Sequence, residues 1–599
     1  MKRTHLLQLT ALSLSVLTVL SGCGAAGASI YMNNGEVVNI GDATVQVPED
    51  PEAADGASSD KTQGTPAAAG TDAQGTDAAP QNADGTDPAS SSDPNAVGSS
   101  GTDPYITGGG ISPYYKPDGT DTTGSDSGLP TITDPATNPD QIWSENRGDT
   151  STLGNTAVGT SPYTSTSSQT TTETAAPVRL DYDVYVATTG DDYSGTGTYD
   201  NPFRTIQKGL DSVSANHKVY LLSGIYEGAN KFTASGSGKG PITVTTYPGN
   251  SATVQLAPGE SGAIFDINGQ SNITISNLRI GYSYAPWVYG VFMSGGESDI
   301  TVENCEICNI STTAAPGGGG AYAVLAYGKG ATDTKAIRNV TIYDNNIHDI
   351  YTGLSEGIAA SGNVDSIYVD GNTIYEISNI GIDLIGGIGY SEDQALDHPR
   401  NCQISGNTVY HCVSPFAACA AIYVSGCRDC VITDNYVYEN AYGIEVADEN
   451  YNMYYPTTNI SVDGNTVHNN HDSGITIGGV NPITSGYVTN SKLTRNILYN
   501  NGMYINDGAN GEIHFEKCDN IDVSDNIVRN HDYKNAVIGC TLTSEYVKNV
   551  KFNNNLYAYD KPEKIVFKFQ GNDYIGLENW NKFTGGKDIS APKAAGSTK

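Results

Sequence analysis

Positively charged residues are scarce in this sequence of 599 residues. It contains 31 Lys and Arg against 66 Asp and Glu, which gives a formal net charge of −35 at pH 7. This charge argues against nucleic acid as a partner, because nucleic-acid binding depends on cations that neutralise phosphates. It also disfavours direct binding of an acidic polymer unless a metal ion mediates the contact.

The sequence has only a short apolar segment near its start. An apolar run from Leu6 to Leu20 follows Lys2 and Arg3, and it is too short to span a membrane comfortably. Residues 1–23 end in Leu-Ser-Gly-Cys and resemble a bacterial lipoprotein signal peptide, with Cys23 as the lipidated residue. A plain secretory signal and a short membrane helix are the alternatives. The resemblance implies a lipid anchor on the extracytoplasmic face of the cell membrane or at the cell surface, with Cys23 as the only membrane contact.

Residues 24–180 are rich in Ser, Thr, Gly, Asp, Ala and Pro. Such a composition cannot bury enough apolar surface to become ordered. We predict a disordered linker over 24–180, which would act as a stalk for the following domain or as a simple spacer.

The cysteine pattern does not predict a zinc centre of four thiolates. The ten cysteines include Cys23 and the CxxC pairs Cys305/Cys308 and Cys427/Cys430. Residues three apart in a strand point to opposite faces, and the two pairs fall several repeats apart, so no four-ligand site follows. The sequence leaves open whether any cysteines pair with one another.

The chain contains a repeated phrase of the form apolar-x-apolar-x-x-Asn-x-apolar-Tyr, seen in residues 366–387 and 400–426. Most steps between the repeated asparagines are 27 to 35 residues long. A fixed period with alternating apolar strands inside each unit predicts a solenoid of stacked coils. Cys305 takes the Asn position in one coil, and the asparagines stand at Asn277, Asn345, Asn372, Asn407, Asn435, Asn465, Asn496, Asn526 and Asn554.

This repeat resembles the right-handed parallel β-helix of the pectate-lyase-like superfamily, including its ladder of asparagines. Asn suits a tight bend between two strands, because it tolerates left-handed backbone angles and can bond to its counterpart on the next coil. We expect an all-β domain of about ten or more coils over residues 181–585, followed by a disordered tail over 586–599.

Short helices are expected to cap both ends of the solenoid. The segment after Pro202 predicts an amphipathic helix with Phe203 and Leu210 on its apolar face, and it resembles the opening segment of polysaccharide lyase family nine. Such a helix covers a first coil that would otherwise be an unpaired edge. Near the end of the chain, a segment similar to the closing helix of such proteins places Trp580 and Phe583 on the last coil.

One strand of each repeat carries a row of residues that should point away from the core and form an exposed ribbon. Its second and fourth positions are apolar and face inward, so its third position faces outward. Asp383 and Glu445 lie two coils apart, about 9–10 Å at the Cα atoms. Leaning together, their side chains would reach the separation of about 6.5–9.5 Å that is typical of inverting glycoside hydrolysis. The row reads Ala359, Asp383, Tyr423, Glu445, Thr476 and His514.

We predict Asp383 and Glu445 as the catalytic carboxylates, with Tyr423 and His514 as candidates for proton transfer. The alternative is that these outward acids are solvated surface. The loops after these strands supply candidates for substrate binding, because Tyr rings offer flat faces to sugars and carboxylates accept hydrogen bonds from hydroxyls. These candidates are Tyr390, His398, Glu449, Tyr451 and Tyr454.

Family nine lyases bind Ca²⁺ through several Asp on these strands and use a Lys as the base. Their Asp-Gly-Phe-Ala-Ala-Lys pattern is similar to residues 356–361 here, and their Asp-Asp-Gly-Trp-Asp pattern to residues 379–383. The resemblance implies Glu356 and Asp383 as calcium ligands. This chain has Asn and Ile in place of the first two Asp of the second pattern and no Lys in the outward row, so a Tyr or His of that row would be the base of an elimination.

A second outward column, three residues after the repeated Asn, is aromatic. At strand spacings of about 4.8 Å its rings are expected to stack on a different face of the solenoid. We interpret the column as structural, with carbohydrate adhesion as the alternative. It comprises His348, Tyr375, Tyr410, Tyr438, His468 and Tyr499.

Taken together, these features predict a surface-anchored protein that degrades a polysaccharide, either by hydrolysis or by β-elimination with calcium as the cofactor. The alternative is a non-catalytic glycan-binding or adhesive surface protein. The sugar, the linkage and the oligomeric state do not follow from the sequence.

Overall fold

The computed structural model describes residues 28–31, 37–40, 179–450, 455–479, 485–502, 511–529 and 535–590. They belong to two compact units, one within residues 1–96 and the other within residues 97–599. In the first unit, β1 (Ala28–Tyr31) and β2 (Val37–Ile40) form an antiparallel pair inside the stretch for which we predict a disordered linker. Cys23 and most of that stretch lie outside the described residues. No helix among the described residues has the length and hydropathy to cross a membrane.

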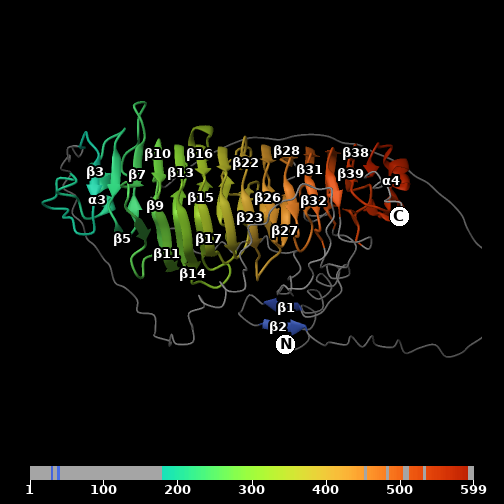
Figure 1. Ribbon diagram of the computed structural model, residues 1–599, viewed down its shortest axis with the longest axis horizontal. Coiled ribbons are helices and arrows are strands. Elements are labelled where there is room, and N and C mark those ends of the chain that lie inside the picture. The colour runs from blue at the N-terminus through green and yellow to red at the C-terminus, as the bar shows by residue number, and fades with distance from the viewer. Residues whose placement is uncertain are drawn as a thin grey trace, which may run out of the picture. The chain divides into compact units, whose positions relative to one another are not determined.

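The second unit is a right-handed parallel β-helix, as the repeat predicts. Each complete coil contributes one strand to each of three parallel sheets, and Figure 1 shows the strands stacked in chain order from β3 at one end to α4 (Leu577–Thr584) at the other. We call the sheets the first, second and third sheet, in the order in which the chain passes through them.

The first sheet consists of β3 (Val184–Val186), β4 (Lys218–Leu221), β7 (Ile242–Thr246), β10 (Ile273–Ser276), β13 (Ser298–Glu303), β16 (Ile337–Tyr343), β19 (Val364–Asp370), β22 (Gln403–Ser405), β25 (Arg428–Thr433), β28 (Thr457–Asp463), β31 (Val488–Thr494), β34 (Cys518–Ser524), β37 (Val547–Lys548) and β38 (Lys551–Asn553). The second sheet consists of β5 (Gly224–Glu227), β8 (Ala252–Gln255), β11 (Arg279–Ala285), β14 (Glu306–Thr312), β17 (Asn346–Tyr351), β20 (Thr373–Ile377), β23 (Thr408–Cys412), β26 (Tyr436–Tyr438), β29 (Thr466–His468), β32 (Ile497–Tyr499), β35 (Ile527–Arg529), β39 (Leu556–Tyr557) and β42 (Ile589–Ser590). The third sheet consists of β6 (Asn230–Lys231), β9 (Gly262–Asp266), β12 (Trp287–Met293), β15 (Gly320–Gly328), β18 (Ile358–Gly362), β21 (Ile382–Ile385), β24 (Ala420–Ser425), β27 (Tyr442–Ala447), β30 (Ile475–Gly478), β33 (Ile513–Phe515), β36 (Ile538–Gly539), β40 (Val566–Phe569) and β41 (Asn572–Ile575).

The core is a continuous column of aliphatic side chains that the three sheets enclose. Successive coils place Val369, Ile404 and Ile432 at equivalent inward positions of the first sheet, and all three are fully buried. Cys402 and Cys430 are also buried and pack in this core. Since each coil buries its apolar face against the coils on both sides, the stack as a whole, and not a single coil, carries the stability.

The predicted asparagine ladder lies at the bend between the first and second sheets. Each member donates its backbone N–H and side-chain Nδ2 to the Oδ1 of the next, at 2.9 to 3.1 Å, from Asn345 onward. Cys305 begins the ladder, because its backbone N–H donates to Asn345 Oδ1 at 2.9 Å. Beyond Asn526 the ladder continues through Asn555 and ends at Asp588.

Two positions of the predicted ladder are wrong by one residue. Asn277 and Asn554 have left-handed backbone angles and lie just before the ladder positions, which Leu278 and Asn555 occupy. At residues 553–555 three neighbouring asparagines leave open which of them turns inward, and after the left-handed Asn277 the inward position is taken by the buried Leu278. The bend has one left-handed residue followed by one inward residue, and Asn suits both positions.

A second ladder, which the sequence analysis did not predict, lies at the bend between the second and third sheets. Cys412 N–H donates to Asn440 Oδ1, and the amides of Asn440, Asn470 and Asn501 are bonded in the same way. The ladder ends at the buried carboxyl of Glu512, which accepts from the backbone N–H and from the Nδ2 of Asn501.

Helices cap the β-helix at both ends. α3 (Ile206–Ser212) begins three residues later than Phe203, which is buried beside β3, and it packs Leu210 on the first coil. Two short 3-10 turns, η2 (Asp333–Lys335) and η3 (Pro562–Lys564), lie within loops. At the other end, Trp580 of α4 is fully buried and stacks on Phe567 at 4.5 Å, whereas Phe583 is 40 % exposed. β42 pairs with β39, so the β-helix extends beyond the expected boundary at residue 585.

Candidate active site

The register of the third sheet places the predicted outward residues in one row. Asp383 of β21 pairs directly with Tyr423 of β24, and Tyr423 pairs with Glu445 of β27. Thr476 and His514 continue the row on β30 and β33. Their common face follows from the alternation of side chains along each strand.

The row is far less exposed than the sequence analysis predicted. Asp383 is 2 % exposed and Tyr423 is 6 % exposed, while Glu445 and His514 are half-buried. The expectation of an exposed row is therefore wrong. The alternation of side chains along a strand shows which way a side chain points, but not how deeply neighbouring groups bury it. On the outer face, Tyr423 packs against Ala420 and Ala447 in a small apolar cluster.

Burial and crowding raise the pKa values of the carboxyl groups in this row. Burial raises the pKa of Glu445 to about 8, with added repulsion from Glu449 and Asp472. The pKa of Asp383 also lies well above its usual range, first because of burial and then because of repulsion from Glu356 and Glu449. Water no longer stabilises the charged form, and each neighbouring negative charge disfavours ionisation further. Such a cluster holds protons at neutral pH and is typical of functional sites.

Several polar atoms along this face are buried and have no hydrogen-bond partner among the described residues. They include Asp383 Oδ1, Thr476 Oγ1 and Glu516 Oε2. Glu516 follows β33, and burial and then repulsion from Glu445 raise its pKa well above the usual range. Because buried polar groups in native proteins are nearly always paired, unpaired oxygens gathered on one face indicate that a ligand or water binds there.

Tyr423 is held by a short hydrogen bond from its phenol to Glu449 Oε1. Burial, followed by the charges of Glu449 and Glu445, raises the pKa of Tyr423 well above its usual value of 10. A phenol in this state donates a hydrogen bond and does not release its proton at neutral pH. The predicted role of Tyr423 as the base of an elimination is therefore disfavoured.

The candidates for substrate binding lie in different surroundings. Glu449 is half-buried in contact with Tyr423, so it is part of the carboxyl cluster. Tyr390 is half-buried and meets Tyr327 edge to face at 5.6 Å. Tyr451 and Tyr454 lie outside the residues that the structure describes.

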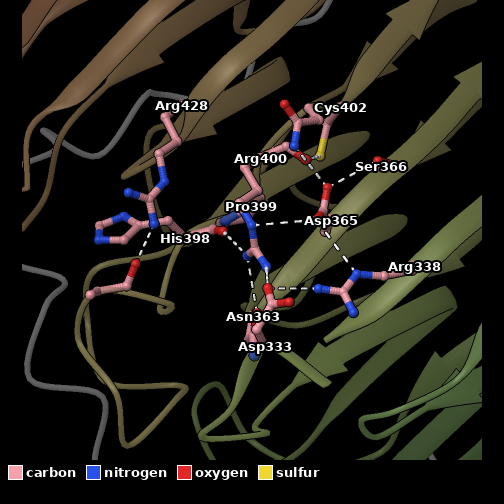
Figure 2. A network of polar contacts seen from close by, with 12 residues as sticks. Asp333, Arg338, Asn363, Asp365, Ser366, His398, Pro399, Arg400, Cys402 and Arg428 are labelled. Carbon is pink, nitrogen blue, oxygen red and sulfur yellow. Dashed lines mark hydrogen bonds and ion pairs between the residues drawn. The ribbon is translucent and has the colours of Figure 1, made fainter. Parts of the chain in front are cut away.

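His398 is not available to a substrate. Its ring is 2 % exposed, its Nδ1–H donates to Gly426 O at 2.5 Å, and burial lowers its pKa. Figure 2 shows His398 at the end of a loop that a polar network ties to the outside of the first sheet. In this network Arg400 donates to Asn363 Oδ1 at 3.0 Å and lies 3.6 Å from Asp365, so the surroundings of His398 favour a structural role.

The donor set around Asp383 suits calcium chemically, but it does not form a closed cage. Carboxylate and amide oxygens, such as those of Glu356, Asp383 and Asn379, are the hard ligands that Ca²⁺ prefers, and Asp383 Oδ1 and Asn379 Oδ1 are unpaired. Among the described residues, three His, Cys or carboxylate donors lie within 4.8 Å of one another on the second sheet and not at Asp383. They are Glu306, Cys308 and His348. A cation at Asp383 would therefore need further ligands from substrate or water.

Three members of the cluster were not predicted from the sequence. Asp472 precedes β30, Glu516 follows β33, and Tyr322 stands on β15 with its pKa raised by burial and then by Glu356 and Asp383. Glu516 lies two residues after His514, but Asp472 lies four residues before Thr476 and Tyr322 three before the row position of β15, so alternation along one strand does not single them out.

The second aromatic column stacks as predicted. Neighbouring rings from His348 to Tyr499 lie 4.5 to 5.2 Å apart and within 9° of parallel. Each ring covers the faces of its neighbours, so these faces are not open to a sugar. This geometry favours the structural interpretation over adhesion.

Comparisons with known proteins agree with this architecture. Residues 262–454 match the family described as "Right handed beta helix region". A relative in Bacillus subtilis (strain 168), the uncharacterized protein YwoF, is 30 % identical over 423 residues, which cover 67 % of this chain and 85 % of YwoF.

Solved structures with partial likeness include an alginate lyase from Paenibacillus sp., with 17 % identity, a TM-score of 0.37, and coverage of 49 % of this chain and 91 % of that one. The pectate lyase Pel9A has 12 % identity, a TM-score of 0.30, and coverage of 64 % and 77 %. The relationship to YwoF and the architecture of three parallel sheets lead to one conclusion. The chain belongs to the family of YwoF, and its fold is a right-handed parallel β-helix.

Proposed function

We propose that the protein hydrolyses a polysaccharide on the outer face of the third sheet. The observation that carries this proposal is the half-buried Glu445, whose pKa of about 8 keeps its carboxyl group protonated at neutral pH. It shares a row with the buried Asp383, whose Oδ1 is unpaired. Two carboxyl groups in unlike surroundings are the usual requirement for glycoside hydrolysis.

In this proposal Glu445 donates its proton to the oxygen of the scissile glycosidic bond. An ionised carboxylate of the same cluster takes a proton from the attacking water. The candidate is Glu449, which accepts the hydrogen bond of Tyr423, because burial and repulsion from its neighbours keep Asp383 protonated. Mutual repulsion prevents the carboxyl groups from all being ionised together, so the cluster supplies an acid and a base at the same pH. Tyr423 positions Glu449 through their hydrogen bond.

The charge of the molecule favours a neutral polysaccharide as the substrate. The chain carries a formal net charge of −35, so an acidic polymer would be repelled. Calcium bound by Glu356 and Asp383 would offset that repulsion. Elimination from a uronate is the less supported reaction, because the row has no Lys and Tyr423 retains its proton.

We also propose that the protein is anchored by lipid at Cys23 on the extracytoplasmic face of the membrane. The support is the signal-like composition of residues 1–23. A polysaccharide outside the cell would then meet the enzyme at the cell surface.

Reducing ends and the ultraviolet absorbance of unsaturated uronates, followed together on neutral and acidic polysaccharides, distinguish the reactions. We expect reducing ends without absorbance, unaffected by a chelator. Glu445→Gln should lower turnover at least about 100-fold while the circular dichroism spectrum stays unchanged, because general acid catalysis contributes about that much or more. The matched control is Glu545→Gln, which changes an exposed carboxyl group outside the row and should keep full turnover.

Absorbance that disappears with chelator would instead identify a calcium-dependent lyase. Binding of a polysaccharide without any product would identify a glycan-binding protein. Either outcome, or full turnover in Glu445→Gln, would contradict the proposal.

A further inference from the structure

The aromatic column of the second sheet ends at a group of metal-binding side chains. The six stacked rings run from Tyr499 to His348, and the residue that pairs with His348 on the next strand is Cys308. Beyond Cys308 the same row continues with Gly281, which has no side chain. After the six rings, the row therefore continues with the thiol of Cys308 and then with a position that carries no side chain.

Three potential ligand atoms converge at this place. Glu306 lies two residues before Cys308 on β14 and so faces the same side of the sheet. The thiol of Cys308, a carboxylate oxygen of Glu306 and a ring nitrogen of His348 all lie within 4.8 Å of one another. Glu306 Oε1 lies 3.5 Å from His348 Nε2.

His348 Nε2 is aimed into this group and is unsatisfied. His348 is 9 % exposed, and its Nε2 is buried without a hydrogen-bond partner. The other ring nitrogen, Nδ1, lies 2.7 Å from Asp349 Oδ2, so an Nδ1–H donated to Asp349 leaves a lone pair on Nε2. A carboxylate on the far nitrogen of a ligating histidine is the usual support of such a ligand, since it fixes the ring and strengthens its basicity.

The remaining contacts orient the other ligands. Arg279 Nε donates to Glu306 Oε2 at 2.5 Å, which leaves Oε1 facing the imidazole. Tyr375 stacks on the His348 ring at 4.9 Å, within 7° of parallel, and restricts its rotation. Cys308 is fully buried and lies outside the apolar core, so its thiol faces this group and not the interior of the coil.

We propose that Glu306, Cys308 and His348 form a binding site for a divalent metal ion of the zinc type. Thiolate, imidazole and carboxylate are the ligands that Zn²⁺ takes in proteins, and three of them leave a fourth position for water or an external ligand. On binding, Cys308 releases its proton to solvent, so the thiolate and the carboxylate balance the two charges of the ion. The site stands on another sheet than the carboxyl row and does not depend on the proposed hydrolysis.

Titration of the reduced full-length protein with Co²⁺ tests this site, because a thiolate bound to cobalt gives a charge-transfer absorbance. We expect a band that saturates at one ion per chain and is abolished by Zn²⁺. Cys308→Ser should abolish the band, and His348→Phe, which keeps the ring stack, should weaken binding at least about tenfold. Asp349→Asn should weaken it about 10- to 100-fold through the supporting hydrogen bond.

Matched controls come from residues of the same kind at other positions. Cys402→Ser changes a buried core thiol, and His468→Phe changes another ring of the same stack. Both should retain the band and the wild-type affinity. The proposal is overturned if the wild type shows no band, if Cys308→Ser retains it, or if the controls lose binding as strongly as the ligand variants.

Discussion

At the scale of single residues, the carboxyl groups of the third sheet retain protons because they are crowded and shielded from water. Glu445 meets repulsion from Glu449 and Asp472, and Asp383 meets it from Glu356 and Glu449. A single buried carboxyl group would lower the stability of the folded protein without giving it a function. Several of them, with unpaired oxygens on one face, form a site that can give and take protons.

The raised pKa of Glu445 makes the stability of the protein depend on pH. Its folded pKa of about 8 lies above its ordinary value of 4.5, so between these values the folded state holds a proton that the unfolded state has lost. The free energy of unfolding should therefore fall as pH rises through this window. In Glu445→Gln the fall should be smaller, by up to about 1.4 kcal/mol per pH unit for one proton.

Denaturant unfolding at a series of pH values measures this difference. Glu545→Gln, which changes an exposed carboxyl group, should follow the wild type across the series. A Glu445→Gln curve with the same slope as the wild type would show that Glu445 is ionised in the folded protein.

At the scale of elements, side-chain amides at two bends hold the coils in register. Each ladder amide accepts from a backbone N–H of the preceding coil and donates to a backbone carbonyl of that same coil, as Asn435 does with Asn407 N–H and Ile404 O. Buried bends would otherwise leave backbone groups unpaired. The ladders end in carboxyl groups, Asp588 and Glu512, which accept without having to donate.

Neighbouring asparagines allow a matched test of the first ladder. Asn555 is buried and bonded to Asn526, Val523 and Asp588, whereas Asn554 is exposed with a φ of 60°. Asn555→Gly should lower the free energy of unfolding by about 2–3 kcal/mol, because it leaves buried partners unpaired. Asn554→Gly should change it by less than about 1 kcal/mol, since Gly adopts that backbone angle without strain.

Chemical denaturation of both variants measures the two changes. Equal losses of the free energy of unfolding in the two variants would mean that the side-chain amide of Asn555 contributes no stability of its own.

At the scale of the whole molecule, the two ends of the β-helix are closed in different ways. At the start, α3 lies so close to the first coil that a Cβ on Gly209 would come within 2.8 Å of the Val219 side chain. At the far end, β41 turns antiparallel to β40 and Trp580 donates to Asp588 Oδ2 at 3.0 Å, which joins the closing helix to the end of the ladder. Both closures cover edges that would otherwise pair with other chains.

The proposed lipid anchor is also a property of the whole molecule. The protein should remain with the membrane fraction after a high-salt wash and should incorporate a labelled fatty acid. Cys23→Ser should lose both, because Cys23 carries the proposed lipid. Retention of Cys23→Ser in the washed membranes would contradict the proposal, and Cys402→Ser is the control for thiol loss.

Much of the fold follows from the sequence because its signals are local. The repeat period, the inward apolar columns, the outward row from Asp383 to His514 and the stacked aromatic column depend on alternation within a strand and on equal spacing between coils. The ladder positions near Asn277 and Asn554 needed the structure, since the repeat pattern does not tell whether an Asn is the left-handed residue of the bend or the inward residue after it.

Tertiary structure alone decided the chemistry of the molecule. Alternation places Asp383 and Glu445 on the outer face, but the pKa of each depends on burial and on carboxyl groups that other coils supply. In the same way, the pairing of β14 with β17 brings His348 beside Cys308, although an insertion separates the two residues by 40 positions in the sequence. The repeat period and the direction of each side chain are encoded locally along the chain. Proton affinity and metal binding instead arise from groups that folding brings together from distant parts of the chain.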